Sequence, residues 1–163
     1  MVPYTTRPIR EGETDGVEYF FTSSEKLEQF KNSGKIVELR TYETVMGPWS
    51  YFTMDDGQFD IHGEGDCLMI GTLESYEKMC RYYGNGALVP VYIEVPDGIR
   101  LLRAVKREGK QKNPNYREVC RRYLADEDDF SEELLSRLRI GKRFSNTDLE
   151  ACLEEILKEM ESH

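Results

Sequence analysis

The sequence TTRPIREGETDGVEYFF, residues 5–21, places two arginines, an acidic turn bounded by glycines and an aromatic run next to one another. Pro8 follows Arg7 directly and restricts the backbone between Arg7 and Arg10, so both guanidinium groups could converge on one anion. Arginine suits phosphate because its planar fork donates two hydrogen bonds at once and stays charged. Surface arginines on a turn are the alternative interpretation of this pair.

Two glycines in the same stretch predict how the chain continues. Gly12 and Gly16 allow sharp turns, because glycine adopts backbone conformations that other residues avoid. Such turns would bring Tyr19 back toward the arginines. Its phenol could then donate a further hydrogen bond to an anion held there.

A carboxylate and a hydroxyl further along the chain could recognise a purine base. Residues 35–43 contain Glu38, residues 50–54 contain Tyr51 and Thr53, and both segments alternate apolar and polar residues as strands do. A carboxylate can accept hydrogen bonds from N1–H and the exocyclic amine of guanine, and a hydroxyl can donate to O6. The Gly-Pro pair at 47–48, between the two segments, predicts a turn.

The composition is that of a globular protein with an acidic net charge. The 163 residues fit a single domain, with 39% hydrophobic and 33% charged residues. The net charge of −9 argues against non-specific binding to nucleic acid or to anionic membranes. No apolar stretch approaches the ~18 residues that a membrane span needs. The N-terminus has no signal-peptide pattern, so we expect a cytoplasmic protein.

The charge is unevenly distributed along the chain. Residues 100–122 hold nine Lys/Arg and two acids, which suggests a small, highly charged anion as ligand; a solvated helix face is the alternative. The four cysteines are widely spaced, without a C-x-x-C motif, so we expect buried, reduced thiols and no metal site.

Periodicity and capping residues predict the remaining elements. The first half is expected to form a small antiparallel sheet with one helix, and the second half an α/β layered fold with a mainly parallel sheet. The expected strands and apolar runs are 17–22, 35–43, 50–54, 67–72 and 87–95, and the expected helices are 25–32, 74–84, 98–109, 115–130 and 148–160. The apolar positions expected to face inward are Ile99, Leu102 and Val105 on the helix 98–109, and Leu149, Leu153, Ile156 and Leu157 on the helix 148–160.

The order of these residues resembles the guanylate kinase family, whose GMP-binding region follows TTR-x-P-R-x-GE-x-x-G-x-x-Y-x-F. The matching positions are Thr5-Thr6-Arg7, Arg10, Gly12-Glu13, Gly16, Tyr19 and Phe21, with the proline directly after the first arginine. The resemblance implies that Arg7, Arg10, Tyr19 and Tyr51 bind the GMP phosphate, that Glu38 recognises guanine and that Thr53 places a hydroxyl on the base. Two positions depart from the family: Pro3 replaces a serine, and Thr72 replaces a second guanine-recognising aspartate.

The resemblance extends to the basic segment. The family closes over ATP with a helical lid whose arginines embrace the phosphates, and Arg103, Arg107 and Arg121 match these positions, which implies a catalytic role in neutralising the transferred phosphoryl group. It also implies a P-loop-kinase-like three-layer core, with ATP and Mg²⁺ as cofactors in the intact family form. The implied regions are the GMP-binding region 1–66, core strands and helix 67–99, the lid 100–125 and C-terminal core helices 126–163.

One family motif is not found in the sequence. The family's G-x-x-G-x-G-K-[ST] loop precedes TTR by roughly 25–30 residues and holds phosphates with backbone N–H groups and a lysine. GKRFS at 141–145 has the Gly-Lys pair without a glycine loop before it. We therefore expect the chain to lack the first strand and the P-loop, to keep the GMP site and lid, and to show little or no kinase activity alone.

Two other functions remain open from the sequence. The first is a non-catalytic module that binds GMP or a phosphorylated peptide through the same arginines and tyrosines, and the second is an α/β domain without a ligand. Loss of a central strand would leave unpaired strand edges and exposed apolar surface. We therefore also expect self-association through exposed sheet edges.

Overall fold

A computed structural model describes residues 1–44, 46–63, 65–84 and 86–161. The chain divides into two compact units, residues 1–88 and 89–163, which are described separately. The first unit contains β1 (Tyr4–Thr5), β2 (Phe20–Phe21), α1 (Ser24–Ser33), β3 (Ile36–Thr44), β4 (Gly47–Met54) and α2 (Leu73–Tyr83). The second contains β5 (Tyr92–Glu94), α3 (Asp97–Glu108), α4 (Tyr116–Asp129), α5 (Glu132–Arg137), β6 (Arg143–Ser145) and α6 (Leu149–Met160).

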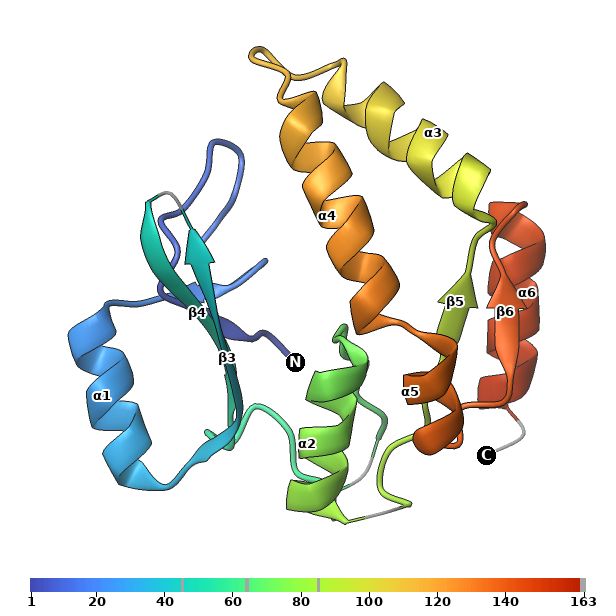
Figure 1. Ribbon diagram of the computed structural model, residues 1–163. Helices are drawn as coiled ribbons and strands as arrows, with labels where there is room; N and C mark the ends of the chain where they lie inside the picture. The colour runs from blue at the N-terminus through green and yellow to red at the C-terminus, as the bar shows by residue number, and fades with distance from the viewer. Residues whose placement is uncertain (45, 64, 85, 162–163) are drawn as a thin grey trace. The chain divides into compact units, whose positions relative to one another are not determined.

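The first unit is built on a four-stranded sheet in the order β2-β1-β4-β3. β4 is antiparallel to both β1 and β3, whereas β1 and β2 are parallel. β3 and β4 lie between α1 and α2 in Figure 1. The small antiparallel sheet expected from the sequence is therefore present, with one parallel pair at its edge.

A β-bulge between Ile36 and Glu38 determines which side chains of β3 share a face. Because side chains alternate along a strand, the extra residue places Glu38, opposite Thr53, on the face away from Ile36. The Ile36 face packs against α1. Its core comprises the buried Leu27, Phe52 and Met54, with Tyr4, Phe30, Ile36 and Leu39 packed against them.

The helices of the first unit begin and end where their capping residues predict. Ser23 caps α1 by accepting a hydrogen bond from the Lys26 N–H, and Gly34 ends it in the left-handed conformation with φ of 70°. Thr72 caps α2 by accepting from the Ser75 N–H. The predicted turn at 47–48 is wrong, because Thr44 pairs with Gly47 and both residues of the Gly-Pro pair belong to β4. The predicted strand 17–22 is confirmed only as β2.

The second unit surrounds a parallel pair of strands, β5 and β6. α3 and α4 form a helical hairpin, and α6 follows β6 (Figure 1). The buried residues of this unit are Leu135, Ile140, Phe144 and Cys152. The helices α3, α4 and α6 are confirmed, whereas α5 was not anticipated. The strands of this unit are parallel as expected, but the partner of β5 is β6, which was not anticipated.

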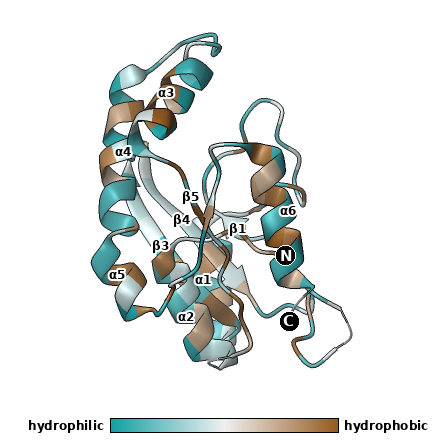
Figure 2. Ribbon diagram, turned by 90° about the vertical axis from the view of Figure 1, so that its right-hand side faces the viewer, coloured by the Kyte–Doolittle hydropathy of each residue, from teal (hydrophilic) through white to brown (hydrophobic). Residues whose placement is uncertain are grey.

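Several apolar segments are more exposed than the sequence predicts. Residues 67–72 form no strand, and Ile70 is 96% exposed; within 87–95 only β5 is a strand, and its Ile93 is exposed. The expected inward positions that are exposed are Leu102, Val105, Leu149, Leu153 and Leu157. Hydrophobic patches are visible on α6 in Figure 2. The sheet of the second unit has only two strands and offers little surface for helices to cover. Within the described part of that unit, the exposed apolar side chains of α3 and α6 are therefore not covered by a second layer of secondary structure.

The state of the cysteines agrees only in part with the sequence-based expectation. All four thiols are free; Cys152 is buried, Cys67 and Cys80 are half-buried, and Cys120 is exposed. The expectation of burial is wrong for Cys120 because α4 has no buried residue. Across the described ranges, no helix is both long enough and apolar enough to cross a membrane.

Candidate functional site

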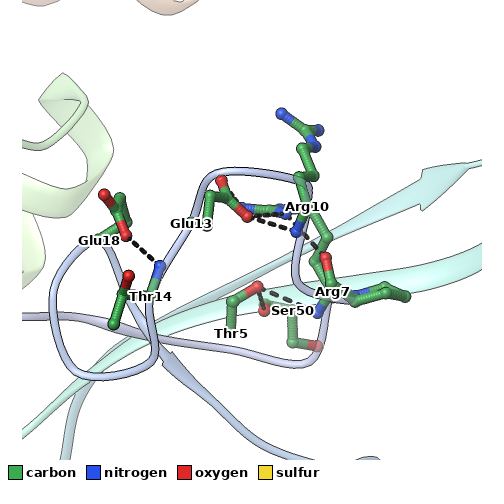
Figure 3. Close-up of polar contacts among 8 residues, drawn as sticks. Thr5, Arg7, Arg10, Glu13, Thr14, Glu18 and Ser50 are labelled. Atoms are coloured by element: carbon green, nitrogen blue, oxygen red, sulfur yellow. Dashed lines mark hydrogen bonds and ion pairs between the residues drawn. The ribbon is translucent and has the colours of Figure 1, made fainter.

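The loop that follows β1 is fastened to β4 by two threonines. The Thr5 hydroxyl donates to the Ser50 carbonyl at 2.9 Å and accepts from the Arg7 N–H at 3.1 Å. The Thr6 hydroxyl accepts from the Ser50 N–H at 2.9 Å. Thr5 is fully buried, so these contacts fix the backbone at Arg7 (Figure 3).

Arg7 is a buried cation that is paired within its own loop. Its two Nη atoms donate to the two carboxylate oxygens of Glu13, each at 2.9 Å, and Nη1 also donates to the Pro8 carbonyl at 2.8 Å. The side chain is only 3% exposed. Hydrogen bonds to Glu13 raise the pKa of Arg7 foremost, with Tyr51 contributing less, and the same bonds are the main cause of the lowered pKa of Glu13.

The side chain of Arg10 does not take part in the ion pair between Arg7 and Glu13. Its backbone N–H donates to Glu13 at 2.7 Å, while its side chain is exposed and points away from the pair in Figure 3. Glu13 thus contacts both arginines. Glu13 has no predicted role within the motif, although its opposite charge six residues after Arg7 is a signal for a loop-closing ion pair.

Tyr19 returns to Arg7 as the glycines predict. Gly12 and Gly16 have φ of 85° and 81°, a region that favours glycine. The Arg7 guanidinium carbon lies 5.4 Å from the centre of the Tyr19 ring, within the range of a cation–π contact. The Tyr19 ring in turn lies 5.8 Å from the ring of Tyr51 on β4. Three predicted phosphate ligands therefore lie together.

The predicted base-recognising residues form a second cluster on the same sheet. Glu38 is 3% exposed and accepts from the Thr53 hydroxyl on Oε1 at 3.1 Å. Its Oε2 accepts from Nε of Arg40 at 3.1 Å, and Nη1 of Arg40 donates to the Thr72 hydroxyl at 3.0 Å. Glu38 and Thr53 are register partners, as are Arg40 and Tyr51, so the two clusters are adjacent on one face.

Arg40 was missed by the sequence analysis. Burial opposes its charge, yet the neighbouring carboxylate of Glu38 leaves its pKa raised. The alternation of a strand places residues two apart on one face, so the spacing of Glu38 and Arg40 was a signal that could have found it.

The three lid arginines lie on the helical hairpin of the second unit. Arg103 on α3 donates to the carbonyls of Asn146 and Thr147 at 2.9 and 3.3 Å, and Arg107 is exposed. Arg121 on α4 forms two 2.8 Å hydrogen bonds to Glu118. Hydrogen bonding from Arg121, followed by Arg122, lowers the pKa of Glu118 to about 2.

The described residues do not fit a metal–triphosphate centre. None of their His, Cys, Asp and Glu side chains gather in groups of three or more that could hold a metal ion. The 163-residue sequence also contains no G-x-x-x-x-G-K-[ST] motif. We therefore derive no reaction step through ATP or Mg²⁺ from these residues.

Comparisons with known proteins find similarity to guanylate kinases. The family model described as guanylate kinase matches residues 1–49. A guanylate kinase from Salinibacter ruber is 28% identical over 157 residues, which cover 96% of this chain and 77% of that protein. A guanylate kinase from Streptococcus pyogenes serotype M3 is 46% identical over 41 residues, 25% of this chain and 19% of that protein.

A solved structure extends the likeness to the whole fold. The crystal structure of guanylate kinase from Anaplasma phagocytophilum matches 99% of this chain and 73% of its own chain, with a TM-score of 0.64 and 18% sequence identity. At this identity the match shows the fold, which is mixed α/β and of the P-loop kinase type. Taken together, the family-model match, the relative that aligns along nearly the whole chain and the shared fold support a guanylate kinase-like domain.

Proposed function

We propose that the first unit binds GMP on the face of the sheet that carries Glu38 and Tyr51. The observation that carries this proposal is the continuity of the two clusters: Arg7, Tyr19 and Tyr51 are in contact, and Tyr51 is the register partner of Arg40 beside Glu38. A nucleotide monophosphate has an anionic end and a hydrogen-bonding base. The site offers complementary groups to both.

At the phosphate end, the proposed ligands are Arg7, Arg10, Tyr19 and Tyr51. Arg7 has five N–H donors; the contacts to Glu13 and Pro8 use three of them, and a hydrogen bond to Tyr51 uses another. The exposed Arg10 side chain can rotate toward an arriving phosphate, since the hydrogen bonds that join Arg10 to Glu13 use its backbone N–H and carbonyl. The tyrosine hydroxyls add neutral donors.

At the base end, the proposed ligands are Glu38, Thr53 and Thr72. An ionised carboxylate has about four acceptor positions, and Thr53 and Arg40 occupy two of those of Glu38. The remaining positions suit N1–H and the exocyclic amine of guanine. Thr72, at the start of α2, is joined to this end of the site through Arg40.

We further propose that the site serves the phosphorylation of GMP to GDP, within purine nucleotide metabolism of the cytosol. Guanylate kinases use ATP and Mg²⁺ for this reaction. We propose that Arg103, Arg107 and Arg121 supply positive charge that favours an anionic phosphate ligand. Because the 163 residues contain no P-loop motif, we expect them to bind GMP and to show little or no transfer when assayed alone.

Isothermal titration calorimetry tests the GMP site. The chain is titrated with GMP, with AMP and with a phosphotyrosine or phosphoserine peptide, and then with ATP and Mg²⁺. We expect GMP to bind and Glu38→Gln to weaken it, whereas Glu43→Gln, an exposed position on the same strand, leaves the affinity unchanged. Phosphopeptide binding without GMP binding would instead support a non-catalytic module, and no binding of either ligand would refute both proposals.

A final proposal concerns self-association of the second unit. The exposed apolar side chains of this unit include Ile93, Leu149, Leu153 and Leu157, and β5 and β6 form a sheet of only two strands. Light scattering coupled to size-exclusion chromatography is expected to show oligomers at micromolar concentration. A monomer over the whole concentration range would contradict this expectation.

A further inference from the structure

Arg40 bridges the two residues that the sequence assigns to base recognition. It donates from Nε to Glu38 on its own strand at 3.1 Å and from Nη1 to Thr72 at the start of α2 at 3.0 Å. Its side chain is 15% exposed, so it lies mostly enclosed but retains access to solvent. Arg40 is thus the group that joins the sheet to the α2 cap at the base end of the site.

The hydrogen bond from Thr53 leaves one position of the expected base site without a donor. The sequence analysis assigned the Thr53 hydroxyl to O6 of guanine. In the structure the single proton of that hydroxyl is directed to Oε1 of Glu38, because an ionised carboxylate can only accept. A guanine whose N1–H and amine face Glu38 therefore needs another donor for O6.

Arg40 can supply that donor. A guanidinium has five N–H groups, and the hydrogen bonds to Glu38, Thr72 and Tyr42 use three of them. The remaining donors belong to the group that already contacts the carboxylate, so donor and acceptor are next to each other as they are on the edge of guanine. Arginine paired with O6 and N7 of guanine is the commonest specific contact to that base in nucleic-acid recognition.

We propose that Arg40 is a specificity-determining residue, which fixes the Glu38 carboxylate and donates to O6 so that 6-oxopurine monophosphates are preferred over 6-aminopurine monophosphates. This inference rests on the proposed GMP site. Adenine carries an amine in place of O6, and that amine would meet the donors of Arg40 and leave them unpaired. Desolvated donors without an acceptor oppose binding, which is how a polar site rejects the wrong base.

The experiment measures the affinities of GMP, IMP and AMP for the wild-type chain and for Arg40→Met, which keeps a long apolar side chain and removes the donors. We expect GMP affinity to fall by ~10–100-fold and the GMP-to-AMP preference to fall by a similar factor, the range of one bidentate base contact. Arg81→Met is the matched control, because Arg81 is an exposed arginine on α2 paired with Glu77. Its affinities should equal those of the wild type.

Further arms separate specificity from a purely structural role. Arg40→Lys keeps the positive charge but not the fork that reaches Glu38 and Thr72 together, so it too should lose preference for GMP over AMP; it also serves if Arg40→Met fails to fold. If both variants weaken all three nucleotides by one factor, with the preference intact, the inference is overturned while the GMP site stands. If the wild type binds GMP with no preference over AMP, the inference also fails. Absence of GMP binding in the wild type refutes the proposed function together with it.

Discussion

Replacement of Arg7 by Met tests whether a buried ion pair holds the loop after β1. The Arg7 side chain is 3% exposed and donates twice to Glu13 at 2.9 Å and once to Pro8 at 2.8 Å. Methionine preserves much of the side-chain volume and none of the donors. A hydrogen bond to a charged group contributes about 1.5–3 kcal/mol, and the two parallel bonds act as one bidentate contact. We expect the free energy of unfolding of the first unit to fall by about 1.5–3 kcal/mol.

The chain contains a suitable probe for this measurement. Trp49 is the single tryptophan of the sequence and lies in β4, in the same unit as Arg7. Urea denaturation followed by its fluorescence gives the free energy from the midpoint and slope of the transition. Arg10→Met is the matched control: Arg10 is exposed and its backbone bond to Glu13 is retained, so a change within about 0.5 kcal/mol is expected. Equal losses in the two variants would refute the reasoning.

The same variant should alter the response to acid. The hydrogen bonds from Arg7 lower the pKa of Glu13 below its ordinary value of 4.5. A lowered pKa in the folded state contributes stability that is present above pH 4.5 and lost as the pH falls through the folded value. In Arg7→Met this part of the acid dependence should be reduced. An unchanged pH profile would mean that Glu13 gains nothing from the pair.

Three other variants test packing and titration. Phe52→Ala removes a fully buried ring between Tyr4 and Phe30 and is expected to cost about 3–5 kcal/mol in the same fluorescence assay; a loss below 1 kcal/mol would contradict the assigned core. Glu118, with a pKa of about 2, stabilises the folded state above pH 4.5 and less so as the pH falls toward 2, so Glu118→Gln should weaken the acid dependence of helical circular dichroism. Burial, then the hydrogen bond to Asp56, raises the pKa of Tyr4 to about 12. The contribution of the neutral Tyr4 to the free energy of unfolding is therefore complete below pH 10 and is lost as the pH rises toward 12. Tyr4→Phe should reduce this loss when unfolding is measured across that range.

Local signals predicted the elements that local interactions determine. Ser23 and Gly34 bound α1 because a hydroxyl satisfies its first free N–H groups and a glycine permits its left-handed end. The alternation in 35–43 and 50–54 predicted β3 and β4, because one face of each strand is apolar. The turns at Gly12 and Gly16 were predicted for the same kind of reason. Each depends on residues close in sequence.

Features that depend on contacts between distant segments were not predictable in the same way. The hydrogen bond of Arg40 to Thr72 joins residues 32 apart, and the orientation of the Thr53 hydroxyl toward Glu38 depends on the register of two strands. The exposure of Leu153 on α6 also has a non-local cause: the apolar stripe predicted a helix, while burial requires a second surface. A pattern predicts which face is apolar and not what covers it.

The proposed site contains two arginine–carboxylate pairs in which opposite members are the proposed ligands. In the pair Arg7–Glu13 the arginine is the proposed ligand for phosphate and the carboxylate supports it, whereas in Arg40–Glu38 the carboxylate is the proposed ligand for the base. Each pair brings opposite charges within about 3 Å, so at distances beyond a Debye length of ~8 Å the two pairs contribute little net field. We infer that the exposed Arg10 supplies the electrostatic attraction for an approaching anion. The two arginine–carboxylate pairs supply the short-range contacts. On an acidic chain with a net charge of −9, such pairing presents fixed hydrogen-bonding groups to a nucleotide without requiring a basic surface.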